Sequence, residues 1–171
     1  YVTGSSEGAP YSADYFTIKY DPLGTVLWSA RYNNGGNDVP RAIAVDAAGN
    51  VYVTGMSFQP ETYYDLVTIK YNAAGQQLWL ARYNGPGNLW DDGKDINVDP
   101  SGNVYVTGKS EGAGSDYDFV TIKYNASGQE QWVKRYNGTA GLYDGAETMA
   151  SDFQGNIYVT GYTRTGETTY E

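Results

Sequence analysis

Hydrophobic and polar positions divide the chain into short apolar runs separated by small polar turns. In one stretch the runs cover residues 42–46, 50–56, 65–72 and 77–84, and Gly, Asn, Asp or Pro bounds them. Branched and aromatic residues favour extended backbone, whereas Gly, Asn and Asp favour turns. No apolar period of helical type is present, so the pattern predicts an all-β chain. The runs are apolar on both faces, which indicates sheets sandwiched between neighbouring sheets.

The same succession of runs recurs along the whole chain. Tyr-Val-Thr-Gly begins at residues 1, 52, 105 and 158, at spacings of 51, 53 and 53 residues. Other recurring elements are Thr-Ile-Lys-Tyr at 17–20, 68–71 and 121–124, Arg-Tyr-Asn at 31–33, 82–84 and 135–137, and Asp-x-x-Gly-Asn at 46–50, 99–103 and 152–156. Four strands in a repeat of about 50 residues are typical of a β-propeller blade.

The repeat predicts a single β-propeller fragment over residues 1–171, with four-stranded antiparallel blades of 51–53 residues. The expected pieces are strands two to four of a blade over 1–33, whole blades over 41–84 and 94–137, and strands one and two of a blade over 146–162. Propellers close with about four to eight blades. About three blades are therefore incomplete, and the expected partners are the remaining blades of a longer polypeptide. The turns 46–50 and 99–103 are expected on the face opposite the loop 85–94.

Three segments carry a resemblance to a known family. GNVYVTG, YDFVTIKYN and W-x-x-RYNGPGN resemble the SBBP β-propeller repeat of bacterial and archaeal proteins. The resemblance covers essentially the whole chain and implies a propeller in a large secreted or cell-surface protein. It brings no established catalytic residues.

Composition narrows the possible partners. The net charge is −9, with 11 Lys plus Arg against 20 Asp plus Glu, which disfavours nucleic acid and anionic lipid. The chain has no Cys and no His, so disulfides, thiolate nucleophiles and the usual zinc ligands are excluded. No apolar stretch approaches the roughly 20 residues that span a bilayer, so membrane insertion is not expected.

Strictly recurring side chains are expected to be structural, because one ligand needs residues that differ between blades. This applies to the sets Lys19/Lys70/Lys123, Arg31/Arg82/Arg135 and Trp28/Trp79/Trp132. The basic residues are expected to pair with Asp14, Asp65 and Asp118, and the three tryptophans to be mostly buried between blades. No cofactor is expected, with calcium on the Asp-x-x-Gly-Asn turns as an open alternative.

Candidate function is assigned to the long, differing loops. Their aromatic and acidic residues are Tyr11, Asp38, Tyr63, Tyr64, Trp90, Asp91, Asp92, Tyr117, Tyr143 and Asp144. The ligand-binding candidates are Asp38, Trp90, Asp91, Asp92, Tyr143 and Asp144. Trp90 is interpreted as lacking a counterpart in other repeats and is expected to be more exposed than the three recurring tryptophans.

Aromatics beside carboxylates suit a sugar ring or a cation. The favoured hypothesis is a non-enzymatic structural or recognition module of an extracellular protein, binding a glycan or a protein through this rim. The alternative is a lyase or glycosidase that uses Tyr and paired carboxylates.

Overall fold

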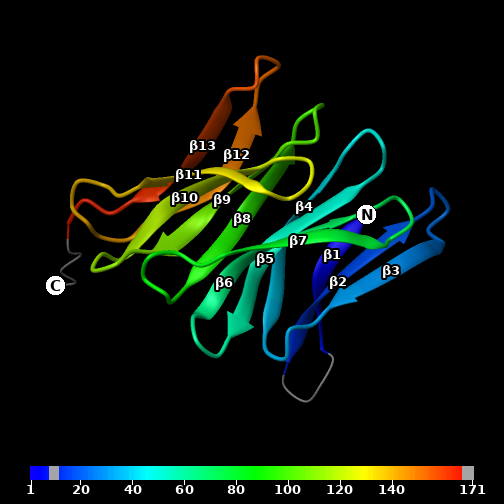
Figure 1. Cartoon of the computed structure of the whole chain (residues 1–171), viewed down its shortest axis with the longest axis horizontal. Helices are drawn as coiled ribbons and strands as arrows, with labels where there is room; N and C mark the ends of the chain where they lie inside the picture. The colour runs from blue at the N-terminus through cyan, green and yellow to red at the C-terminus, as the bar shows by residue number, and fades with distance from the viewer. Residues whose placement is uncertain (8–11, 167–171) are drawn as a thin grey trace.

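The computed structural model describes residues 1–7 and 12–166, and this part of the chain is all β (Figure 1). Its strands are β1 (Val2–Glu7), β2 (Ala13–Tyr20), β3 (Val26–Tyr32), β4 (Asp38–Val45), β5 (Val51–Gln59), β6 (Tyr63–Tyr71), β7 (Gln77–Tyr83), β8 (Asp91–Val98), β9 (Val104–Glu111), β10 (Tyr117–Tyr124), β11 (Glu130–Tyr136), β12 (Asp144–Ser151) and β13 (Ile157–Thr163). Tyr11, one of the loop aromatics, lies outside the described residues. Within the described ranges, no helix is long and apolar enough to cross a membrane.

The strands form four antiparallel sheets in chain order. The two whole repeats are the sheets β4-β5-β6-β7 and β8-β9-β10-β11, flanked by β1-β2-β3 and β12-β13. In Figure 1 the sheets follow one another across the molecule, from the blue β1–β3 to the orange and red β12–β13. The first strands β4, β8 and β12 contact one another in succession, so they are the innermost strands. The predicted blades and their strand order are confirmed.

Antiparallel pairing places the connections at two opposite ends of the sheets. We call the end with the turns 46–50, 72–76, 99–103 and 125–129 the turn rim, and the end with the β5–β6 and β7–β8 connections and their equivalents the loop rim. The turns 46–50 and 99–103 therefore lie opposite the loop 85–90, as the sequence predicts.

Hydrogen bonds saturate the recurring Asp turns. Asp46 Oδ1 accepts from the backbone N–H groups of Ala48 and Asn50, each at 2.9 Å. Its Oδ2 accepts from Asn50 Nδ2 at 2.7 Å and from the Tyr52 hydroxyl at 2.9 Å. Gly49 has φ +79°, a left-handed conformation that Gly adopts without a steric penalty. The same arrangement recurs at Asp99 and Asp152, so these carboxylates shape the turn rim.

The innermost strands begin earlier than the sequence suggests. They start at Asp38, Asp91 and Asp144, whereas the expected boundaries are 41, 94 and 146. Each strand contains a β-bulge a few residues after its start, between Pro40 and Ala42 in β4 and at the equivalent places in β8 and β12. The bulge breaks the alternation of side chains, which hides the first residues of the strand from a pattern of period two.

Neighbouring sheets are joined by the recurring Trp and Lys side chains. Trp79 Nε1 donates to the carbonyl of Ala126 in the next sheet at 3.1 Å, and Lys70 Nζ donates to the same carbonyl at 3.4 Å. Trp28 and Lys19 make the equivalent bonds to Ala73.

The three recurring tryptophans occupy equivalent strand positions and are largely covered, as predicted, and Trp90 falls in the same range of exposure. Trp28, Trp79, Trp132 and Trp90 are all half-buried. The recurring tryptophans lie on the outermost strands of their sheets, where Trp28 and Trp79 contact the next sheet. Trp90 instead packs against aromatic neighbours on the loop rim, described below.

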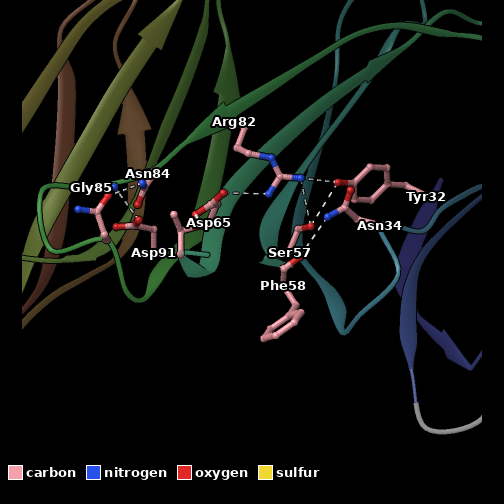
Figure 2. A network of polar contacts seen from close by, with 11 residues as sticks. Tyr32, Asn34, Ser57, Phe58, Asp65, Arg82, Asn84, Gly85 and Asp91 are labelled. Atoms are coloured by element: carbon pink, nitrogen blue, oxygen red, sulfur yellow. Dashed lines mark hydrogen bonds and ion pairs between the residues drawn. The ribbon is translucent and has the colours of Figure 1, made fainter. Parts of the chain in front are cut away.

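The recurring Arg residues pair with Asp residues as predicted. Arg82 Nη1 lies 3.1 Å from Asp65 Oδ2, and Figure 2 shows the guanidinium between this carboxylate and the Ser57 and Tyr32 hydroxyls. Arg31 pairs with Asp14 at 2.6 Å, and Arg135 pairs with Asp118 at 2.7 Å. Recurrence thus identified structural ion pairs.

Candidate functional site

The residue before each innermost strand occupies a fixed place on the loop rim. The backbone carbonyls of Asn37, Trp90 and Tyr143 accept from the backbone N–H groups of Phe58, Glu111 and Arg164, at 3.0, 3.0 and 3.1 Å. Trp90 therefore has counterparts in Asn37 and Tyr143, each 53 residues away in the sequence. The interpretation of Trp90 as a residue without a counterpart is wrong, because the chemical type changes at this position while its backbone role persists.

Aromatic pairs fasten these positions to the preceding sheet. The ring centroids of Tyr64 and Trp90 lie 4.7 Å apart, and those of Tyr117 and Tyr143 lie 4.8 Å apart. Tyr64 and Tyr117 are equivalent residues at the start of the third strand of their sheets. Such a contact contributes roughly 0.5–1.5 kcal/mol beyond burial of its area. We call Tyr64–Trp90 and Tyr117–Tyr143 the aromatic pairs.

Lys109 links the two aromatic pairs. Its Nζ lies 5.8 Å from the ring centroid of Trp90, 4.5 Å from that of Tyr117 and 5.1 Å from that of Tyr143. The same nitrogen donates a hydrogen bond of 2.6 Å to the Tyr143 hydroxyl. The structure thus brings Trp90 and Tyr143 together around one cation, and both rings are engaged in contacts within the protein.

Between the first two sheets, the positions equivalent to the aromatic pairs hold Ala13 and Asn37 instead, and a pocket lies there among the described residues. Its volume is about 300 Å³, and it is lined by Ser12, Gly35, Gly36, Asn37, Phe58, Tyr63 and Tyr64. Ala13 occupies the position of Tyr64 and Tyr117, since each directly precedes the Asp of an Arg–Asp pair. Three aromatic rings and two polar side chains therefore surround an uncharged pocket on the loop rim.

Tyr63 has the most unusual backbone in this region. Its φ is +66°, in the left-handed region that a bulky side chain rarely occupies. The ring is 49% exposed and contacts Phe58, Tyr64 and Trp90 at centroid distances of 5.9, 4.9 and 5.7 Å. Strained residues of this type cluster at ligand sites, which makes Tyr63 a candidate for contact with a ligand.

Three of the predicted site carboxylates are buried structural groups. Asp38, Asp91 and Asp144 are at most 1% exposed. Their Oδ2 atoms accept from the backbone N–H groups of Asn34, Gly85 and Gly138 at 2.7, 2.7 and 2.6 Å, which fixes the start of each connection. Figure 2 shows the contact between Asp91 and Gly85. The innermost strand begins at these acids and the sheets cover them, so ligand binding through them stays a prediction that their burial does not favour.

Burial alters the acidity of two of these carboxyl groups. Desolvation raises the pKa of Asp91 to about 6, against the hydrogen bond from Gly85 N–H that lowers it. Desolvation likewise raises the pKa of Asp38, which accepts from Asn34 N–H. Both groups are thus held in an environment that disfavours their charged form.

Asp92 is buried in a different way. Its Oδ2 lies 3.2 Å from Arg41 Nη2 and 2.8 Å from Lys94 Nζ, and its side chain is 1% exposed. Arg41 belongs to β4, whereas Lys94 follows Asp92 on β8, so the carboxylate joins two innermost strands. Asp92 therefore acts in a contact between sheets, and its predicted ligand role is not supported by this position.

The turn rim holds two larger hollows, which are lined mainly by the recurring Asp turns and the residues next to them. One of about 490 Å³ is lined by residues 45–48 and 98–102, and one of about 590 Å³ is lined by residues 98–101, 105, 151–155 and 157. Both lie between successive Asp turns, whose carboxylate oxygens already accept hydrogen bonds from the protein. Across residues 1–7 and 12–166, no group of three or more His, Cys, Asp or Glu side chains is placed to hold a metal ion.

The structural role of three of these carboxylates could have been predicted from the sequence. Asp38, Asp91 and Asp144 recur at spacings of 53 residues, the same mark that identifies the structural Arg and Trp residues. The pocket residues Ser12, Asn37 and Phe58 had no such signal, because their importance depends on what is absent from the neighbouring sheet. Tyr63 appears among the loop aromatics, but its backbone conformation is visible only in the structure.

Comparison with known proteins agrees with the repeat architecture. The family described as "Beta-propeller repeat" (SBBP) matches residues 27–57 and 78–114. A protein of Acanthamoeba polyphaga mimivirus, named as an uncharacterized WD repeat-containing protein, is 30% identical over the aligned stretch. That stretch covers 56% of this chain and 8% of the viral protein, so the chain spans a small part of its relative. Together with the antiparallel sheets described above, these matches are consistent with β-propeller repeats, and residues 27–57 and 78–114 are similar to the SBBP family.

Proposed function

We propose that the chain is a non-catalytic recognition module of a larger extracellular or cell-surface protein, and that it binds a glycan through the loop rim. The observation that carries this proposal is Tyr63, whose half-exposed ring stands on a left-handed backbone beside Phe58, Tyr64 and Trp90. An aromatic face offers stacking to the apolar face of a sugar ring. The cost of about 1–3 kcal/mol for such a backbone suggests that the exposed ring serves a purpose other than packing.

The two rims differ in a way that supports this assignment. On the turn rim the recurring Asp residues are bonded to their own turns. On the loop rim the residue before each innermost strand changes from Asn37 to Trp90 to Tyr143. A ligand that is recognised by one part of a repeat array needs such differences between repeats.

The enzymatic alternative has less support. Glycoside hydrolysis uses two carboxyl groups roughly 5–9 Å apart on either side of the bond that is cleaved. The described residues that line the loop-rim pocket include no Asp or Glu. The nearby Asp38 and Asp91 are buried and bonded to backbone N–H groups. The recognition proposal therefore fits the chemistry of the rim better.

A glycan array probed with the whole chain tests the proposal. We expect the chain to bind a subset of glycans and Tyr63→Ala to weaken that binding at least about tenfold, since a central aromatic anchor carries much of the energy of an interface. Phe153→Ala is the matched control, because Phe153 is 98% exposed on the turn rim. Equal binding by both variants would show that the loop rim is not the site, and an array without any bound glycan would exclude the glycan function.

A further inference from the structure

The pocket between the first two sheets exists because one aromatic pair of the repeat is absent. In the next two junctions the pairs Tyr64–Trp90 and Tyr117–Tyr143 fill the equivalent space. In the first junction the corresponding residues are Ala13 and Asn37, and Ala13 N donates to Asn37 Oδ1 at 3.1 Å. The β3–β4 connection, 33–37, is also two residues shorter than the β7–β8 connection, 84–90. Less side-chain volume and a shorter connection leave the hollow of about 300 Å³.

The surrounding backbone holds the pocket in shape. A Cβ atom on Gly36 would lie 2.6 Å from Phe58 Cδ1, so this position tolerates only Gly while Phe58 keeps its place. The backbone N–H of Phe58 donates to Asn37 O at 3.0 Å, as Glu111 does to Trp90 in the next junction. The connection is thus anchored by the same backbone hydrogen bond as in the next repeat. The pocket results from different side chains on the same backbone arrangement.

We propose that this pocket is a saccharide subsite that holds one neutral pyranose ring; the inference rests on the proposed glycan recognition and specifies its ligand. The lining joins the aromatic side chains of Phe58, Tyr63 and Tyr64 with the hydroxyl of Ser12 and the amide of Asn37. A pyranose has an apolar face that packs on rings and hydroxyl groups that exchange hydrogen bonds with amides and hydroxyls. The volume is at the lower end of the range for ligand pockets, which suits a single ring.

The absence of charge in the lining selects the class of sugar. Within residues 1–7 and 12–166, the lining of this pocket contains no Lys, Arg, Asp or Glu. An acidic sugar would bury its carboxylate without a partner in a protein of net charge −9, which costs free energy. Ser12 Oγ is buried and has no hydrogen-bond partner within the described ranges, so a ligand hydroxyl gives it one.

A quaternary ammonium ion is the competing ligand, since aromatic cages bind such cations. The three rings here meet edge to face, with interplanar angles of 73–85°. They also share the pocket with two polar side chains, which a quaternary ammonium group does not use. The neutral sugar is therefore favoured.

The experiment fills the pocket with the aromatic pair that the other junctions already carry. The whole chain is titrated by calorimetry and by ligand-observed NMR with methyl glucoside, methyl galactoside, methyl mannoside, methyl N-acetylglucosaminide, methyl glucuronide and choline. We expect binding of at least one neutral glycoside, and a loss of at least about tenfold in Ala13→Tyr/Asn37→Trp because the ring is excluded. Ala140→Trp is the control, since it adds an aromatic residue at an exposed position of another loop-rim connection.

A second variant keeps the test decisive if the double substitution unfolds the chain. Asn37→Leu keeps the number and branching of the side-chain heavy atoms and removes the amide, and circular dichroism verifies its fold. Weaker glycoside binding in this variant and in Tyr63→Ala supports the subsite. Loss of binding in Tyr63→Ala alone overturns the subsite and leaves the rim proposal standing, whereas unchanged binding in all variants overturns both. Preferential binding of choline or of the glucuronide also overturns the inference.

Discussion

Arg82 Nη2 donates a hydrogen bond of 2.8 Å to the hydroxyl of Tyr32, which lies on the outermost strand of the preceding sheet. The same guanidinium pairs with Asp65 of its own sheet at 3.1 Å. Arg135 repeats the arrangement one sheet later, with Tyr83 at 3.2 Å and Asp118 at 2.7 Å. One recurring side chain therefore ties each of the two four-stranded sheets to the previous sheet near the loop rim.

Replacing Arg82 tests the importance of this connection. Arg82→Ala leaves the buried Asp65 carboxylate without its cation and removes the bond to Tyr32. Because the Arg82 side chain is 25% exposed, we expect a loss of about 2–3 kcal/mol in the free energy of unfolding, measured by urea denaturation. Arg31→Ala is the control: Arg31 is 38% exposed and bonds within its own sheet, to Asp14 and Ser6. An equal loss in both variants would contradict a role between sheets.

The pH dependence of stability reflects the raised pKa of Asp91. Burial raises this pKa to about 6, above the value near 3.9 of an unfolded chain, so the folded state binds the proton more tightly. The resulting stabilisation is fully present below about pH 4 and is lost as the pH rises through about 6, by up to about 2–3 kcal/mol. Asp91→Asn should remove this slope in urea melts recorded between pH 4 and 7.

Asp99 should give a pH dependence of stability opposite to that of Asp91. Burial raises its pKa, but hydrogen bonds from Asn103, Ser101 and Tyr105 outweigh burial and lower it overall. A lowered pKa in the folded state gives stability above the unfolded pKa, which is lost as the pH falls. The free energy of unfolding of Asp99→Asn should therefore be lower than that of the unsubstituted chain mainly at neutral pH, and the difference should shrink as the pH falls. If the stability of Asp91→Asn and Asp99→Asn depended on pH in the same way, the opposite pKa shifts given to these two carboxyl groups would be contradicted.

The recurring Trp residues should differ in their contribution to stability. Trp79→Phe removes the hydrogen bond to Ala126 O in the next sheet and keeps most of the ring. We expect a loss of at most about 1 kcal/mol, since the bond lies at an exposed site and Lys70 still donates to the same carbonyl. Trp132 donates no such bond to any described residue, and its ring contacts Tyr105 of its own sheet. Trp132→Phe should cost less in thermal unfolding, and a larger cost there would argue against the bond to Ala126.

Substitution of Tyr63 should separate stability from binding. Asn adopts the left-handed conformation more readily than Tyr, so Tyr63→Asn relieves about 1 kcal/mol of backbone strain and offsets the lost ring contacts. We expect little change in the melting temperature together with a loss of glycan binding. Tyr64→Asn is the comparison: φ is not positive there, and the ring packs against Trp90. A strong destabilisation by Tyr63→Asn would show that Tyr63 is mainly a packing residue.

The sequence by itself determined the repeat, the four strands within it and the two kinds of rim. These are local properties: Val, Ile and Tyr favour extended backbone, and Asp46 with Gly49 forms a turn from its own neighbours. The pairing of Arg82 with Asp65 also followed from recurrence, because a contact needed in each sheet requires the same residues in each repeat.

Only the tertiary structure decided which loop residues are accessible. Asp91 and Trp90 are adjacent in the sequence, yet Asp91 is buried at a strand start and the Trp90 ring packs against Tyr64 of the preceding sheet. The pocket beside Asn37 likewise depends on Ala13 from another sheet, where the other junctions have Tyr. Burial and cavities are set by contacts between residues some 20 to 50 positions apart, and a local pattern contains no record of which side chains meet across two sheets.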